Sequence, residues 1–217
     1  MPLIIAIDGP SGSGKSTLGR MLSRALELLY IDTGSMYRAV ALAVIEGQLD
    51  PNNKEAVVKL AESLDINLEG DPDSLKTLIG VRDVSELIRT DSVTAMSSVV
   101  SAIPGVRRAM VARQRELGKR GAVLNGRDIT TVVFPEADYK FFLTAEPSER
   151  AQRRYLEDHQ KSSATTFDET LADMTERDRR DTTRADSPLK IAADAIVIDS
   201  TGKSIDEVFQ EMIGKIG

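Results

Sequence analysis

The sequence predicts an α/β fold in which helices cover both faces of a central parallel sheet. Short apolar runs alternate along the chain with stretches of helical periodicity, as in α/β proteins. The runs are continuously apolar, which is typical of parallel strands buried on both faces. With 217 residues, of which 41% are hydrophobic and 29% charged, the composition is that of one folded domain spanning residues 1–217.

The expected elements alternate from the first residues onward. Strands are expected at residues 3–7, 28–31, 122–124, 139–143 and 195–198. Helices are expected at residues 15–26, 35–45, 91–102, 104–117, 147–159 and 205–213. In the helix at 104–117 the apolar residues recur at helical spacing, and Pro104 occupies a first-turn position, where proline is tolerated.

Two stretches interrupt this alternation. Residues 64–89 hold short apolar bursts separated by turn signals at residues 70–73 and at Gly80, which predicts a small β-rich insertion. Residues 160–166 are polar and lie between two charged helical stretches. We expect this second stretch to form the tip of a lid.

The composition excludes several classes of function. A formal net charge of -6 provides no overall positive field for nucleic acid. The chain has no cysteine and one histidine, His159, so thiolate chemistry and His-rich metal sites are excluded. No run reaches the ~18 apolar residues of a membrane span, and the N-terminal run is short for a signal peptide. We therefore expect a cytoplasmic protein with no nucleic-acid, membrane or obligate protein partner.

The most specific motif is a glycine-rich loop that fits the phosphate-binding pattern of Gly, four residues, Gly, Lys and Ser or Thr. It follows an apolar run that ends at Asp8, and it leads into a helix. In such loops the backbone N–H groups cradle phosphate oxygens, Lys15 reaches the β- and γ-phosphates, and Ser16 ligates Mg²⁺. We therefore expect ATP to be bound by Gly9, Pro10, Ser11, Gly12, Ser13, Gly14, Lys15, Ser16 and Thr17.

The rest of the chain favours a kinase over a nucleotide-dependent switch. No Asn-Lys-x-Asp run, with which a GTPase reads guanine, is present. A kinase for small substrates needs many cations, because it holds two phosphorylated substrates and stabilises a moving phosphoryl group. The chain supplies arginines for this, at Arg38, Arg107, Arg127, Arg150, Arg153, Arg154, Arg177 and Arg184 among others.

Further motifs resemble those of bacterial cytidylate kinases, in the order found in that family. They are YIDTGSMYR at 30–38, DVSELIRT at 83–90, GRD at 126–128, VVFP at 132–135, ERD at 176–178, RDTTR at 180–184 and SPLK at 187–190. The resemblance implies a P-loop kinase fold with a monophosphate-binding insertion at about 64–90 and a lid at about 150–184. It implies transfer of the γ-phosphoryl group of MgATP to CMP or dCMP, in pyrimidine nucleotide metabolism.

The resemblance also implies roles for individual residues. The positions that match the cytosine-reading residues are Ser98, Arg107 and Asp128. Those that match the monophosphate site are Thr33, Arg38 and Arg127, with Tyr37 as a further substrate contact. Those that match the sugar site are Arg177, Asp181 and Arg184. Catalysis is expected from Lys15 and from the lid arginines Arg150, Arg153 and Arg154.

Two positions depart from the family pattern. Asn125 stands where the family usually has Asp, so a neutral amide replaces a carboxylate near the expected Mg²⁺, and we expect Asp8 or Asp32 to supply the charge instead. Thr130 stands where glycine is common, which predicts that the backbone after Asp128 has less conformational freedom than in the family.

Two alternatives stay open on the sequence alone. The first is a kinase for another small acceptor, such as UMP or a shikimate-like acid. An acid acceptor would leave the pyrimidine-matching residues without a role. The second is a catalytically silent regulator, which would bind ATP without turnover.

Overall fold

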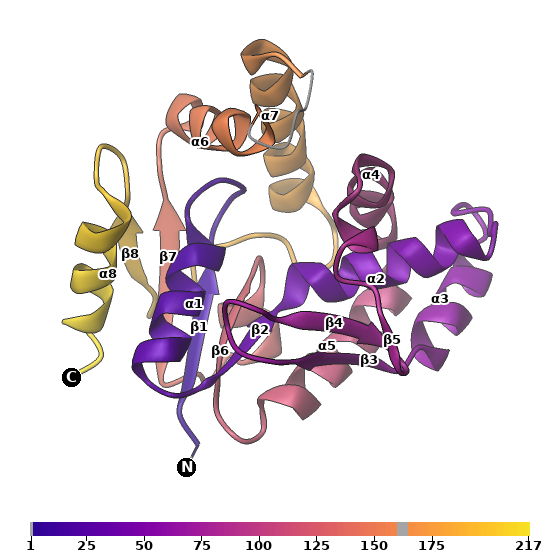
Figure 1. Cartoon of the computed structure of the whole chain (residues 1–217), viewed down its shortest axis with the longest axis horizontal. Helices are drawn as coiled ribbons and strands as arrows, with labels where there is room; N and C mark the ends of the chain where they lie inside the picture. The colour runs from indigo at the N-terminus through magenta and orange to yellow at the C-terminus, as the bar shows by residue number, and fades with distance from the viewer. Residues whose placement is uncertain (1, 160–164) are drawn as a thin grey trace.

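The computed structural model describes residues 2–159 and 165–217, and its centre is a sheet of five parallel strands (Figure 1). The sheet order is β2-β6-β1-β7-β8. The strands are β1 (Ile4–Asp8), β2 (Leu29–Asp32), β6 (Ala122–Gly126), β7 (Tyr139–Thr144) and β8 (Ile196–Asp199). Because the strands are parallel, their carboxyl ends meet at one edge, where Asp8 pairs with Gly126 and Asp32 pairs with Asn125 in register.

Helices cover both faces of this sheet, as its side chains require. In β1, Ile5 and Ile7 belong to one hydrophobic cluster while Ile4 and Ala6 belong to the other. The first cluster is completed by α1 (Lys15–Ala25) and α8 (Ile205–Ile213), and the second by α2 (Thr33–Glu46), α3 (Lys54–Ser63), α4 (Asp91–Val100) and α5 (Pro104–Gly118). This arrangement confirms the predicted fold class.

Two further helices lie over the carboxyl edge of the sheet (Figure 1). They are α6 (Pro147–His159) and α7 (Phe167–Thr183). A capping box at Thr166 and Glu169 fixes the start of α7. Part of the expected lid tip, residues 160–164, lies outside the described residues.

The predicted β-rich insertion forms an antiparallel sheet of three strands. These are β3 (Ile66–Glu69), β4 (Lys76–Ile79) and β5 (Arg82–Asp83), and the short helix η1 (Leu87–Arg89) follows them. Ile66, Leu68 and Val84 belong to the same cluster as α2 and α5, so the insertion packs directly on the main body.

Two helical details differ from the expectation. Helix α3 was not expected, although Asn53 caps it and Val57 and Ala61 lie four residues apart on its buried face. Helix α2 begins at Thr33 instead of residue 35, because the Asp32 carboxylate accepts a hydrogen bond from Gly34 N. Among the described residues, no helix has the length and apolar character needed to cross a membrane.

Candidate active site

The glycine loop joins β1 to α1 at the carboxyl edge of the sheet. Gly9, Gly12 and Gly14 have positive φ angles of 150°, 73° and 90°. A Cβ atom on Gly9 would lie 2.1 Å from Leu143 O, so only glycine fits between the loop and β7. Gly14 is the N-cap of α1 and offers no side-chain cap, so the first N–H groups of this helix are free to bind an anion.

Lys15 is folded back onto its own loop. Its Nζ atom donates hydrogen bonds to Pro10 O and to Ser13 Oγ, and its side chain is buried. Burial and the nearby charge of Arg127 lower the pKa of Lys15 well below its usual value. Lys15 thus lies in a desolvated and electropositive place that favours an anionic ligand.

A cleft of about 670 Å³ extends from this loop across the carboxyl edge of the sheet. Its lining brings together residues that lie far apart in the sequence. Among them are most of the predicted site residues: Ser11, Gly12, Ser13, Gly14, Lys15, Ser16, Thr17, Thr33, Tyr37, Arg38, Ser98, Arg107, Arg127, Asp128, Arg153, Arg154, Arg177, Asp181 and Arg184. Gly9, Pro10 and Arg150 do not line it.

The middle of the cleft holds an excess of positive charge. Arg127 Nε donates to Asp181 Oδ2 at 2.9 Å, and Arg184 Nη1 lies 3.5 Å from Asp181 Oδ1. Within the described residues Arg177 has no hydrogen bond or ion pair, and burial together with the charge of Arg127 lowers its pKa to about 10. Asp181 therefore pairs with two arginines while Arg177 stays unpaired among the described residues, and this excess of positive charge favours binding of phosphate groups.

A second buried group lies at the far end of the cleft. Asp128 Oδ2 accepts a hydrogen bond from Arg107 Nη2, and Asp128 Oδ1 is 3.9 Å from Arg184 Nη2. The Arg107 guanidinium lies over the ring of Tyr37 at 5.3 Å. Asp128 is thus held between two arginines, which the sequence did not indicate. Ser98 lines the same cleft.

Two oxygen atoms that could ligate Mg²⁺ lie at the place expected for this ion. Ser16 Oγ accepts a hydrogen bond from Asn125 Nδ2 at 3.2 Å. Asn125 Oδ1 is buried and has no hydrogen-bond partner. A hydroxyl and an amide oxygen are ligands that suit Mg²⁺, so the residues present fit this ion.

Neither expected substitute for the missing carboxylate is free. Both oxygens of Asp8 accept hydrogen bonds, from Ile129 N at 2.9 Å, Thr130 N at 2.7 Å and Thr130 Oγ1 at 2.6 Å. Asp32 accepts from Gly34 N and pairs with Arg38 at 3.1 Å. These contacts leave the expectation that Asp8 or Asp32 supplies charge near Mg²⁺ as a prediction. The Asp8 carboxylate fixes the π-helical turn η2 (Ile129–Val133), and the Thr130 hydroxyl contributes to that role.

The three lid arginines on α6 have different surroundings. Arg150 is buried, and it donates to Ala145 O at 3.0 Å, Ser11 O at 2.9 Å and Asp178 Oδ2 at 2.6 Å. It therefore ties α6 and α7 to the glycine loop, and its position does not support the predicted contact with a moving phosphoryl group. Arg153 and Arg154 do line the cleft, and their ion-pair partners are Glu149 and Asp158 on the same helix.

The cleft also contains residues that the sequence reasoning missed. Arg20 from α1 and Arg89 from η1 line it beside the acceptor-site residues, and Lys203 lines it beyond the glycine loop. Arg89 belongs to the DVSELIRT motif, which was noted without a role for any of its residues. Arg20 lies one helical turn after Ser16. A basic residue on the same helix face as Ser16 could have indicated that it lines the cleft.

Comparison with known proteins decides the family. The family model described as cytidylate kinase matches residues 5–217. The chain belongs to the cytidylate kinase family. The cytidylate kinase of Solibacter usitatus (strain Ellin6076) is 48% identical over 217 residues, which cover 99% of this chain and 91% of that protein. The cytidylate kinase of Clostridioides difficile (strain 630) is 44% identical over 215 residues, which cover 99% and 98%.

A solved structure supports the fold alone. It is that of an uncharacterized protein from Eubacterium ventriosum ATCC 27560, with a TM-score of 0.55, 12% identity and coverage of 100% of this chain and 98% of the other. Membership in the cytidylate kinase family confirms the predicted P-loop kinase fold and enzyme class. The chain is a nucleoside monophosphate kinase that uses ATP, and the alternative of a silent regulator is not retained.

Proposed function

We propose that the cleft transfers the γ-phosphoryl group of MgATP to CMP or dCMP, giving ADP and CDP or dCDP in pyrimidine nucleotide metabolism. The proposal rests above all on three buried guanidinium nitrogens that have no hydrogen-bond partner: Arg38 Nε, Arg107 Nε and Arg184 Nη2. All three residues line the cleft. Leaving a buried donor unpaired is costly, so these nitrogens favour a ligand with several acceptor atoms. A pyrimidine monophosphate has such acceptors on its phosphate, its sugar and its base.

The donor nucleotide is assigned to the glycine loop. Its phosphates would accept hydrogen bonds from the free N–H groups at the start of α1. Lys15 would exchange its bonds to Pro10 O and Ser13 Oγ for the β- and γ-phosphates. Phosphate charge next to Lys15 also opposes the lowering of its pKa, so the bound lysine stays protonated.

Mg²⁺ would be held by Ser16 Oγ and Asn125 Oδ1, directly or through its water molecules. Once bound with ATP, it supplies positive charge that offsets the charge on the phosphates. The hydrogen bond between Asn125 and Ser16 positions the hydroxyl for this contact.

The acceptor is assigned to the other side of the cleft. Thr33, Arg38 and Arg127 would bind its phosphate, while Asp181, held by Arg127 at 2.9 Å, would accept from a sugar hydroxyl. Arg177 and Arg184 flank that carboxylate. Arg107 and Asp128, with Ser98 and Tyr37, would contact the cytosine edge, on which the N4 amine donates and the ring atoms accept.

In the reaction an oxygen of the CMP phosphate bonds to the γ-phosphorus, and the bond from that phosphorus to the bridging oxygen of ADP breaks. No protein base is needed, because a phosphate monoester with a second pKa of ~6 is largely ionised near neutral pH. Catalysis then depends on position and positive charge. Arg153, Arg154 and Arg177 line the cleft where that charge is needed, and closure of α6 and α7 would exclude water.

A coupled assay of ADP formation tests the proposal. The enzyme is given MgATP with CMP, dCMP, UMP, AMP or shikimate in turn, and we expect turnover with CMP and dCMP to exceed that with the others. Lys15→Ala is the inactive control, with a rate at least ~100-fold lower because one electrostatic donor is lost. Preferred turnover of UMP or of an acid would contradict the proposed acceptor, and unchanged turnover by Lys15→Ala would contradict the proposed donor site.

A further inference from the structure

The tip of the glycine loop is bound by an ion pair between α6 and α7. Arg150 Nη1 donates to Asp178 Oδ2 at 2.6 Å and to Ser11 O at 2.9 Å. Asp178 Oδ1 accepts a hydrogen bond from Ser11 N at 3.4 Å. The pair thus binds both the N–H and the C=O group of one loop residue. Because the side chains of Arg150 and Asp178 are only 7% and 19% exposed, water competes little for these contacts.

The next residue of the loop, Gly12, packs directly on the same two helices. Its φ angle is 73°, in the left-handed region that favours glycine. A Cβ atom on Gly12 would lie 2.7 Å from Arg150 O on α6 and 3.0 Å from Met174 Cε on α7. Met174 is itself buried. The loop tip is therefore held by close packing as well as by hydrogen bonds, and both come from α6 and α7.

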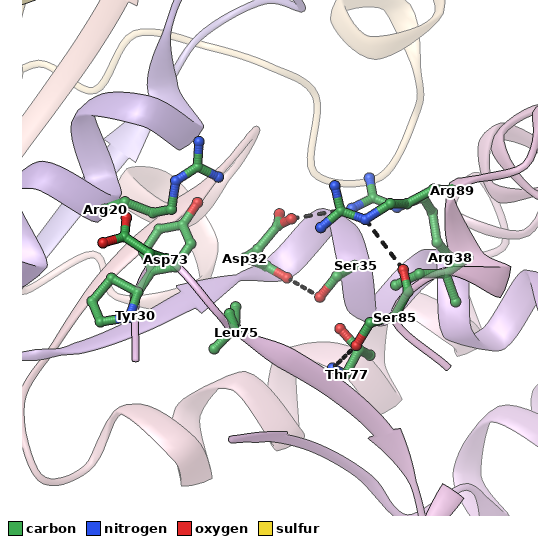
Figure 2. A pocket seen from close by; sticks show the side chains of 12 residues that line it. Arg20, Tyr30, Asp32, Ser35, Arg38, Asp73, Leu75, Thr77, Ser85 and Arg89 are labelled. Atoms are coloured by element: carbon green, nitrogen blue, oxygen red, sulfur yellow. Dashed lines mark hydrogen bonds and ion pairs between the residues drawn. The ribbon is translucent and has the colours of Figure 1, made fainter. Parts of the chain in front are cut away.

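A second ion pair, on the acceptor side of the cleft, shows how the Asp178 pair differs. Figure 2 shows Asp32 paired with Arg38, at 3.1 Å, and Asp32 also accepts from Gly34 N. Asp32 and Arg38 both line the cleft, so a ligand can reach that pair. Asp178 and Arg150 are not part of the lining that the described residues form. The Asp178 pair thus acts on the glycine loop and not on a ligand.

We propose that Asp178 is a positioning residue for the ATP site. Together with Arg150 it holds the peptide groups of Ser11 and keeps the glycine loop in the shape that binds the phosphates. A loop that is already ordered binds its ligand more tightly, because less conformational freedom is lost on binding. This inference rests on the proposed assignment of ATP to the loop.

The charge of Asp178 by itself would act in the opposite direction. A carboxylate within hydrogen-bond distance of the loop repels the phosphates that the loop binds. If charge were its only effect, removal of Asp178 would strengthen nucleotide binding. If it supports the loop, removal weakens binding. The sign of the change in affinity therefore separates the two roles.

Separate titrations with ADP and with CMP test the proposal without turnover. Dissociation constants are measured by calorimetry, with Mg²⁺ present, for the wild type, Asp178→Ala and Asp178→Asn. We expect Asp178→Ala to weaken ADP binding ~10- to 100-fold, the scale of a lost charge-assisted contact, and to leave CMP binding within about twofold. Asp178→Asn keeps one acceptor oxygen and should fall between the wild type and Asp178→Ala. In steady-state assays Asp178→Ala should raise KM for ATP more than KM for CMP.

Asp173→Ala is the matched control, because Asp173 is exposed on the same helix and the substitution removes the same charge. It should bind ADP and CMP as the wild type does. Thermal unfolding of each variant shows whether it is folded. Asp178→Asn, which has nearly the shape of the wild-type side chain, carries the test if Asp178→Ala does not fold.

Unchanged or tighter ADP binding by Asp178→Ala would overturn the inference, because its carboxylate would then not support the loop. Equal losses of ADP and CMP binding would also overturn it, since they would show a general disturbance of α7. A loss of the same size in Asp173→Ala would show an unspecific effect of charge. Failure of the proposed function has a different signature, because ADP affinity would then be unchanged in Lys15→Ala as well.

Discussion

Asp128 and Arg107 form an ion pair that is almost fully buried, with side-chain exposures of 6% and 3%. Arg107 also donates to Ser101 O at 3.1 Å, and Asp128 Oδ1 lies 3.9 Å from Arg184 Nη2, so each member of the pair has a further contact. A carboxylate held in this way acts on a ligand as a fixed negative charge and positions the guanidinium beside it. Base recognition should then depend on the pair as a unit.

Asp128→Ala should therefore reduce the preference for CMP over UMP. The N4 amine of cytosine is attracted by the carboxylate while the O4 atom of uracil is repelled, and one base-edge contact is worth ~1–3 kcal/mol. The ratio of kcat/KM for the two nucleotides measures this change. The variant should also unfold at lower temperature, because Arg107 is left buried without its partner. A ratio that stays unchanged would restrict Asp128 to a structural role.

Substitutions of two lid arginines, Arg154 and Arg150, should affect different properties of the enzyme. Arg154→Ala is expected to lower kcat roughly 10- to 100-fold with little change in KM for CMP, since it lines the cleft and acts on the moving charge. Arg150→Ala is expected to lower the free energy of unfolding by about 1–3 kcal/mol, because Asp178 and Ser11 O lose their partner. Steady-state kinetics and urea unfolding distinguish the two. The same effect on kcat and on unfolding in both variants would contradict these two roles. Arg180 is exposed, and Arg180→Ala serves as the control.

Asn125→Asp should increase the dependence of nucleotide binding on Mg²⁺. A carboxylate in place of the amide adds a charge close to the ion, and we expect Mg²⁺ to strengthen ADP binding on the order of 10-fold more in the variant than in the wild type. Titration calorimetry with ADP, in the presence and absence of Mg²⁺, gives this difference without turnover. The exposed Asn52→Asp is the control for added charge. Equal dependence on Mg²⁺ in both proteins would mean that residue 125 is distant from the ion.

Thr130→Val should destabilise the fold in a way that depends on pH. Burial raises the pKa of Asp8 above its usual 3.8, while the Thr130 hydroxyl opposes this rise. A raised folded pKa means that the native state binds the proton more tightly, so stability falls as the pH increases through that range. Valine removes the opposing bond and makes this loss larger.

The loss in Thr130→Val should be about 1–3 kcal/mol at neutral pH and smaller as the pH falls toward 3.8, the usual value for the Asp8 carboxyl. Urea unfolding across this pH range measures it. Thr130→Ser keeps the hydroxyl and should behave like the wild type. A loss that is the same at every pH would mean that the hydroxyl does not act through Asp8.

The strands and the glycine loop were predictable because their signals are local. Each strand is a short apolar run, and the loop is specified by consecutive residues between a strand and a helix. Helix α3 was missed because its pattern is short, although Asn53 marks its start. The cytoplasmic location stays a prediction.

The details of the site were less predictable because they depend on contacts between distant residues. Arg150, Arg153 and Arg154 share one helix, and only the packing of α6 on α7 decides that Arg150 reaches Asp178 while the other two face the cleft. The bond from Thr130 to Asp8 spans 122 residues, and nothing near Thr130 in the sequence indicates it. The position of Arg89 depends on the fold of the whole insertion.

The insertion shares its apolar interior with α2, α3, α4 and α5, since Ile66, Leu68, Val84 and Ile88 belong to that common cluster. The insertion therefore has no hydrophobic core of its own and should not unfold independently of these helices. Its backbone amides should exchange with solvent in the same cooperative unit as those helices, while α1 and α8, on the opposite face of the sheet, form a second unit. The donor and acceptor nucleotides would then be bound by units of the molecule that can open to solvent separately.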